Sequence, residues 1–222
     1  MKIALIFLLV LAPSLLFGQK TKLVKDQGNY EEYYVLKKNP DVMHGEYKKF
    51  NSKGIIQTVG YYKNGVEDSI WSFYNSKGDL IQKYDVMKKD LVYFKLDDNE
   101  ENRTYKIIDG INNPTVILDR PPLYVGGNDF LYHEILMRIR YPEEALGSNI
   151  KGKVYVSFVI DKSGNLNNFK ILKSLGYGLD EEVIRVFQSL PHNWLPGIYN
   201  GNPVDVEYIY PVSITVQTIT PD

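Results

Sequence analysis

The amino-acid sequence predicts an α+β protein. We expect an N-terminal antiparallel sheet of β-hairpin repeats and a C-terminal domain with two helices packed on a three-stranded antiparallel sheet. Three observations support this prediction. A four-residue turn motif recurs after 24 residues in the first half. In the second half, alternation of apolar and polar residues marks strands, and two segments have the apolar spacing of amphipathic helices.

Residues 1–18 are expected to be a secretory signal peptide. An apolar run extends from Ile3 to Phe17 after a basic residue, and only one proline and one serine interrupt it. A membrane-spanning helix needs about 20 apolar residues, so this run is short for a span, and its proline disfavours a continuous helix. We expect cleavage near Gly18 or Gln19. An uncleaved membrane anchor is the alternative.

The composition is that of a chain that can bury a core. Hydrophobic residues make up 44% of the sequence and aromatic residues 13%. Cysteine is absent, which excludes a lipoprotein attachment site, a disulfide framework and a thiolate metal site. The formal net charge is −1 and neither half has a basic stripe, so nucleic acid is not expected as a partner.

Residues 19–96 are expected to form the repeat domain. The turn Asn51–Gly54 recurs as Asn75–Gly78, and aromatic residues precede both copies. Each copy predicts a strand, a tight turn with a glycine at positive φ, and a second strand. Single hairpins cannot complete a core, so we expect the tyrosines to cover a sheet face; a ligand- or lipid-binding face is the alternative. The block resembles MORN-type repeats and related hairpin repeats of bacterial antitoxin-like and envelope proteins.

Residues 97–120 are expected to be a linker. The segment begins with a run of acidic and amide residues from Asp97 to Asn102 and contains a short apolar stretch, Thr115–Leu118. A proline pair at positions 121 and 122 follows. Because such a composition does not continue the repeat, we place the domain boundary here and assign residues 121–222 to the second domain.

Two helices are predicted in the second domain. Asn128 can cap the first helix, which must end before Tyr141 because the residue ahead of a proline avoids the α region. The apolar face of this helix consists of Leu131, Ile135 and Ile139. The second helix carries acidic residues at 180–182 in its first turn and ends at Pro191. Its apolar face consists of Leu179, Val183, Val186, Phe187 and Leu190.

Three strands are predicted around these helices. A strand over Gly152–Asp161 is followed by a turn at Asp161–Gly164 and a second strand from Leu166 to Lys173. The last strand runs from about Val204 to Val216. The residues expected on its inner face are Val204, Val206, Tyr208, Tyr210, Val212 and Ile214.

Across Pro122 to Thr215 the chain is similar to the TonB C-terminal domain of Bacteroidetes-type proteins. The similarity rests on several motifs in the order and spacing of that family. They are Pro122–Gly127, Tyr141–Ala145, Gly152–Gly164, Leu179–Glu182, Trp194–Gly197, Asn200–Val204 and Tyr210–Val212. The resemblance implies recognition rather than chemistry, because such domains pair their last strand with the N-terminal peptide of an outer-membrane receptor.

The expected contact is backbone pairing along Glu207 to Thr215. Pro211 lacks an N–H donor and so indicates an edge strand, which an added peptide strand requires. The alternative is that Val206, Tyr208 and Val212 are only the core face of this strand. The partner-binding residues that we expect are Glu207, Tyr208, Ile209, Tyr210, Pro211, Val212, Ser213, Ile214 and Thr215, together with Arg140, Tyr141 and Pro142.

The leading hypothesis is an exported periplasmic binding protein linked to TonB-dependent transmembrane transport. A typical energy transducer of this family retains a membrane helix and a proline-rich spacer, and neither is apparent in the sequence. The alternatives are a membrane-anchored transducer that faces the periplasm and a structural envelope scaffold. Enzymatic activity, a cofactor and a metal are not expected, because His44, His133 and His192 lie in different elements without ligand spacing.

Overall fold

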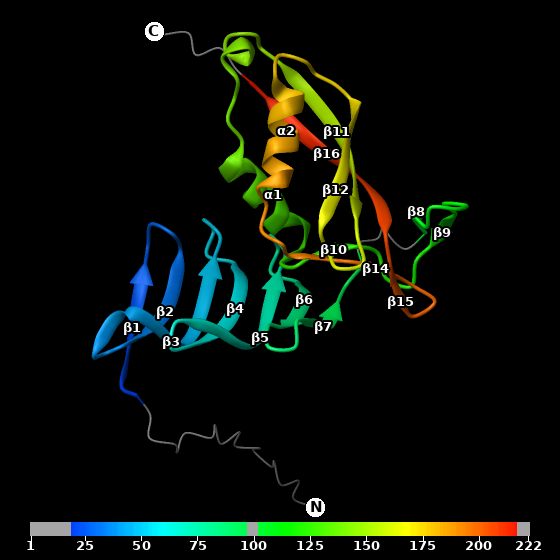
Figure 1. Ribbon diagram of the computed structural model, residues 1–222. Helices are drawn as coiled ribbons and strands as arrows, with labels where there is room; N and C mark the ends of the chain where they lie inside the picture. Colours follow the sequence, from blue (N-terminus) through cyan, green and yellow to red (C-terminus); the bar gives the residue numbers. More distant parts are fainter. Residues whose placement is uncertain (1–18, 97–101, 217–222) are drawn as a thin grey trace, which may run out of the picture.

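The computed structural model describes residues 19–96 and 102–216, and the expected signal peptide lies outside them. An N-terminal sheet is joined to a C-terminal domain in which two helices cover one face of a second sheet (Figure 1). The protein is therefore of the α+β class, with mainly antiparallel strands, as the sequence predicted.

The N-terminal sheet has seven antiparallel strands, and each strand pairs with the next one along the chain. The strands are β1 (Thr21–Asp26), β2 (Glu31–Leu36), β3 (Asn39–Phe50), β4 (Ile56–Lys63), β5 (Val66–Tyr74), β6 (Leu80–Asp85) and β7 (Asp90–Phe94). The two repeated turns have the same geometry. In each, the side-chain oxygen of Asn51 or Asn75 accepts the amide hydrogen bond of the residue two positions on, at 2.9 Å. Gly54 and Gly78 take positive φ, as turn chemistry requires.

Aromatic side chains form the core of this sheet. Tyr47, Trp71 and Phe73 are buried. The ring centroids of Tyr62 and Trp71 lie 5.3 Å apart in an edge-to-face arrangement, which aromatic pairs favour. Gly60 is required beneath the indole, because a Cβ there would lie 2.3 Å from the ring of Trp71. The aromatic residues of the repeat therefore pack against one another.

The C-terminal sheet has five strands in the order β12-β11-β16-β8-β9, two more than predicted. They are β8 (Thr104–Ile107), β9 (Thr115–Ile117), β11 (Lys151–Ile160), β12 (Leu166–Lys173) and β16 (Val206–Thr215). The two additional strands come from the expected linker at 97–120, of which residues 97–101 lie outside the described part. Tyr105 and Ile107 alternate into the core, and the ring of Tyr105 stacks on that of Tyr208. This segment is thus part of the C-terminal domain.

Helices α1 (Gly127–Arg138) and α2 (Leu179–Gln188) bury most of the apolar faces that the sequence predicted. Ile139 is instead the half-buried C-cap of α1, and the buried Leu190 follows the end of α2. The expected cap at Asn128 is wrong. The helix begins at Gly127, and its N-cap is Gly126, two residues before Asn128, in the left-handed region with φ of 99°. Glycine adopts this conformation without the strain that a Cβ causes. The helix ends before Tyr141, and a 3-10 turn, η1 (Glu143–Ala145), follows.

Four short strands complete the domain. They are β10 (Leu123–Tyr124), β13 (Trp194–Leu195), β14 (Gly197–Tyr199) and β15 (Asn202–Val204). The pairing of β15 with β14 explains why the last strand begins at Val206 rather than at Val204. Trp194 is 5% exposed, and its ring centroid lies 5.3 to 5.8 Å from those of Tyr124, Phe158 and Tyr208. It therefore joins the short strands to the main sheet.

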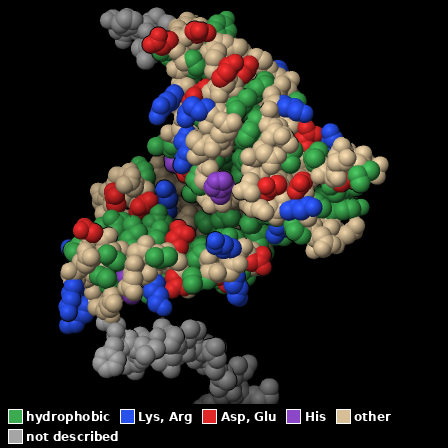
Figure 2. All heavy atoms as spheres, in the orientation of Figure 1, with side chains coloured by type: hydrophobic (Ala, Val, Ile, Leu, Met, Phe, Trp, Pro, Cys, Tyr) green, Lys and Arg blue, Asp and Glu red, His purple; other side chains and the backbone are tan. Residues whose placement is uncertain are grey.

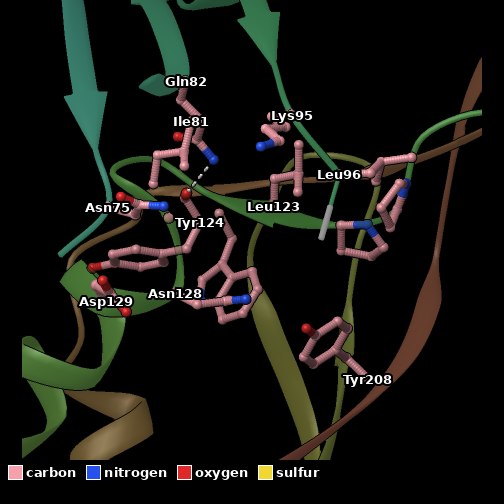
Figure 3. A pocket seen from close by; sticks show the side chains of 14 residues that line it. Asn75, Ile81, Gln82, Lys95, Leu96, Leu123, Tyr124, Asn128, Asp129 and Tyr208 are labelled. Atoms are coloured by element: carbon pink, nitrogen blue, oxygen red, sulfur yellow. Dashed lines mark hydrogen bonds between the residues drawn. The ribbon is translucent and has the colours of Figure 1, made fainter. Parts of the chain in front are cut away.

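The two parts of the molecule meet at Gln82, a buried residue of β6. Its side-chain Nε2 donates to the carbonyl oxygen of Tyr124 at 3.0 Å, the contact drawn in Figure 3, and its Oε1 accepts from the amide of Gly126 at 2.9 Å. The amide of Ser76 also donates to the carboxylate of Asp129 at 3.0 Å. Both bonds of Gln82 fix the turn that starts α1, so the repeat sheet supports the N-terminus of this helix.

We predict that Trp194→Ala lowers the free energy of unfolding by about 3–5 kcal/mol, because the substitution removes a buried ring with three aromatic neighbours. Chemical denaturation of the purified protein measures this loss. The matched control is Met137→Ala, since Met137 is 71% exposed and its loss should change stability by less than about 0.5 kcal/mol. A loss below about 1 kcal/mol for the tryptophan variant contradicts the packing described.

We further predict that a fragment of residues 102–222 melts as one cooperative unit, whereas one of residues 122–222 is less stable. The shorter fragment lacks β8 and β9 and so exposes Val206 and Tyr208, which are buried in the complete sheet. Thermal melts followed by circular dichroism compare the two fragments. Equal midpoints would show that the β8–β9 hairpin contributes nothing to the domain.

Candidate partner-binding edge

β16 is paired along its whole length on one side only. Every residue from Val206 to Thr215 opposes a residue of β11, with no shift in register. On the other side only Val206 and Glu207 are paired, with Ile107 and Lys106 of β8. Among residues 19–96 and 102–216, no other strand pairs with this side of β16. The segment from Ile209 to Thr215 is therefore an open strand edge.

Two backbone hydrogen bonds show which groups point to the open edge. The amide of Ile108 donates to the carbonyl of Asp205 at 2.8 Å, which places the backbone groups of position 205 on the β8 side. The amide of Val216 donates to the carbonyl of Ile150 at 2.8 Å, which places the backbone groups of position 216 on the β11 side. Because these directions alternate along an antiparallel strand, odd-numbered residues of β16 direct their N–H and C=O groups outward.

Pro211 fits this alternation. It is an odd-numbered position, so an N–H group there would point to the open edge. The absence of this group in proline therefore costs no hydrogen bond to β11. Ile209, Ser213 and Thr215 occupy equivalent positions. The unpaired donors and acceptors of these three residues are the groups that an added strand would use.

The side chains of the last strand divide between two faces. Those of Val206, Tyr208, Val212 and Ile214 are buried in the core. The core interpretation is therefore correct for these side chains, because the even positions face the helices. Ile209, Pro211, Ser213 and Thr215 are exposed on the opposite face. A partner would meet the backbone edge and this second set of side chains.

Helix α1 lies on the β16 side of the helical layer. α2 packs against β11 and β12, and α1 packs against the other flank of α2 (Figure 1). Burial raises the pKa of Tyr210 to about 12, with smaller contributions from Tyr208 and from Tyr132 and Asp129 of α1. Tyr132 and Leu136 are exposed, at 46% and 42%, and lie one helical turn apart. Tyr132 of α1 therefore lies near Tyr210 of β16, and Leu136 extends the exposed apolar surface of the helix by one turn.

Three expected site residues lie outside the last strand. The amide of Arg140 donates to the carboxylate of Glu182 at 2.6 Å, and the ring of Pro142 lies against Gly178. Tyr141 is 38% exposed. The contacts of Arg140 and Pro142 are thus with α2 and the turn before it. Within the described residues, no hydrogen bond or ion pair joins them to β16.

Glu207, the first residue of the expected contact, is already engaged by the fold. Its carboxylate accepts a hydrogen bond from the hydroxyl of Ser157 at 2.9 Å and lies 3.4 Å from the ammonium of Lys106. Its backbone also pairs with β8. The open part of the expected contact over Glu207 to Thr215 therefore begins at Ile209, because β8 pairs with Glu207 and its Tyr105 stacks on Tyr208.

A cavity of about 280 Å³ lies where the aromatic face of the repeat sheet meets the C-terminal domain. Tyr62, Trp71 and Tyr84 line it on one side, and Val125 and Phe130 on the other. Figure 2 shows hydrophobic side chains gathered in this hollow. Lys49, which also lines the cavity, forms a 3.5 Å ion pair with Glu31. The buried indole nitrogen of Trp71 has no hydrogen-bond partner within the described residues.

The three histidines lie in separate places. In the repeat sheet, the ring nitrogen Nδ1 of His44 lies 3.0 Å from the side-chain oxygen of Asn64. His133 and His192 are exposed in the C-terminal domain. Within the described residues no group of three or more histidine, aspartate or glutamate side chains could hold a metal ion. Over the same ranges, no helix is both long and apolar enough to span a bilayer.

Sequence reasoning missed two features of this edge. Tyr105 and Ile107 have the alternation of a strand, but a four-residue strand next to a charged run gives a weak signal. Tyr132 and Leu136 were not singled out because they lie off the apolar face that faces the core. Their spacing of four residues was the available signal.

Comparison with protein families gives one match. Residues 137–214 match the model described as Gram-negative bacterial TonB protein C-terminal. The matched segment contains β11, β12, α2 and β16 up to Ile214. Comparison with curated proteins and with solved structures gives no match. The match supports a TonB-like domain and a link to TonB-dependent transport. Domains of this family face the periplasm, are not enzymes and interact with outer-membrane receptors in general.

Proposed function

We propose that this protein is an envelope binding protein that recognises the periplasm-facing N-terminal peptide of an outer-membrane receptor by adding it as a strand to β16. The observation that carries the proposal is the open edge from Ile209 to Thr215, whose odd-numbered residues direct donors and acceptors away from β11. Backbone pairing supplies affinity in such complexes, and side chains at alternate positions supply specificity.

The rest of the domain supports this role. β16 is paired with β11 along its whole length, and the side chains of Val206, Tyr208, Val212 and Ile214 are buried, so the fold holds the strand in place before a partner arrives. A preordered strand loses little conformational entropy on binding. The exposed pair Tyr132 and Leu136 offers apolar contacts to the side of an added strand that faces α1.

We predict that Ser213→Pro reduces peptide binding by more than tenfold and leaves the domain folded. The substitution removes an outward donor, and proline already occupies the equivalent position 211 of the same strand. Calorimetric titration with synthetic N-terminal peptides of outer-membrane receptors measures the affinity, and a thermal melt checks the fold.

Two control variants separate binding from folding. Ser213→Ala keeps the backbone donor and should bind almost as the natural protein does. Ile214→Pro removes a donor on the β11 side and a buried side chain, so it should lower stability instead. If a peptide binds the natural protein and the folded Ser213→Pro variant equally well, the last strand is not the docking edge.

A membrane-anchored transducer is the second candidate, and the apolar run from Ile3 to Phe17 is the observation that favours it. The two candidates share the docking edge and differ only at the N-terminus. Cell fractionation followed by N-terminal sequencing separates them. A mature protein that starts near Gln19 and is released with the periplasm supports a free binding protein. A full-length protein in the inner membrane supports the transducer.

A further inference from the structure

Lysine side chains gather on the face of the C-terminal sheet that the helices leave uncovered. We call this the helix-free face; it consists of the odd-numbered residues of β11 and β16 and the β12 residues opposite them. Lys151 and Lys153 lie on it from β11, opposite Thr215 and Ser213. Lys170 and Lys173 lie on it from β12, opposite Ser157 and Tyr155. All four lysines are exposed.

The charge of this face differs from that of the domain. Residues 121–222 contain 8 basic and 11 acidic residues, a net charge of 8 − 11 = −3. Half of the basic residues nevertheless lie on the helix-free face. The one acidic residue within its strands is Glu207, which is paired with Lys106. Asp161 and Asp205 lie at the opposite end of the sheet from Lys151, where they accept backbone hydrogen bonds in turns.

The lysines next to the open edge make no ion pair of their own. Within the described residues, no carboxylate forms a salt bridge with Lys151, Lys153 or Lys170. The ammonium of Lys173 lies 5.8 Å from the ring centroid of Tyr155. The positive charge beside Ser213 and Thr215 is therefore not neutralised within the domain.

We propose that the strand accepted by β16 carries acidic side chains at alternate positions, facing Lys151 and Lys153, and apolar side chains at the intervening positions, facing Tyr132 and Leu136 of α1. This inference rests on the proposed function. Neighbouring strands lie about 4.8 Å apart, so an added strand would run about 10 Å from β11. A lysine and a glutamate side chain together bridge such a distance, and the separation is close to the Debye length of about 8 Å at physiological salt.

The two pairs of lysines lie at different distances from the added strand. Lys151 and Lys153 are two strands from the added strand, whereas Lys170 and Lys173 are three strands away. Screening reduces the contribution of the more distant pair. Replacing the two lysines of β11 should therefore weaken binding more than replacing the two of β12.

The test uses two nine-residue synthetic peptides, one alternating valine with glutamate and one alternating valine with glutamine. We expect the glutamate peptide to bind about fivefold to tenfold more tightly, the range for two exposed ion pairs. This advantage should shrink as sodium chloride rises from roughly 0.05 M to roughly 0.5 M. The double variant Lys151→Gln plus Lys153→Gln should remove it. Lys162→Gln, in the β11–β12 turn at the opposite end of the sheet, is the matched control and should retain it.

Each other outcome overturns the inference. If both peptides bind equally, strand addition stands and the acidic preference is wrong. If neither binds, the preference is also wrong, and the receptor-peptide titration decides the proposed function separately. If vesicles of anionic phosphatidylglycerol bind the natural protein but not the double variant, while the glutamate peptide does not bind, the lysines contact a membrane surface instead.

Discussion

The pairing of β16 with β11 determines what each part of the last strand presents to its surroundings. The register is continuous from Val206 to Thr215, so one alternation fixes both the side-chain faces and the backbone directions. A slip by one residue would turn the buried valines to solvent and move the missing donor of Pro211 into the sheet. The buried side chains of Val212 and Ile214 oppose such a slip, since exposing them costs about 1.5–3 kcal/mol each.

The repeat sheet contributes a fixed support for one end of the C-terminal domain. Gln82 holds the turn between Tyr124 and Gly126, and this turn starts α1, the helix that flanks the open edge. Breaking a buried bond of this kind leaves a polar group without a partner at a cost of about 1–3 kcal/mol. The repeat sheet is thus docked on the C-terminal domain.

Much of the C-terminal fold could be predicted from the sequence because its apolar periodicity is strong. The spacing of Leu179 to Leu190 defined α2, and alternation from Gly152 defined β11. The β8–β9 hairpin could not be predicted, because its strands are short and their pairing with β16 is a long-range contact. The start of α1 depended on Gln82, which is distant in sequence. Pro211 indicated the open edge. The outward-facing donors, however, could be identified only from the backbone hydrogen bonds of Asp205 and Val216.

The outward backbone donors of β16 are its odd-numbered amides, and no other described strand covers them. Amide hydrogen exchange, followed residue by residue by NMR, distinguishes these amides from the ones that bond β11. We expect rapid exchange at Ile209, Ser213 and Thr215, and slow exchange at Tyr210, Val212 and Ile214, which bond β11. Bound receptor peptide should slow the first group alone. Slow exchange at all six positions without peptide would instead show that another part of the chain already covers the edge, so that β16 is not open to a partner strand.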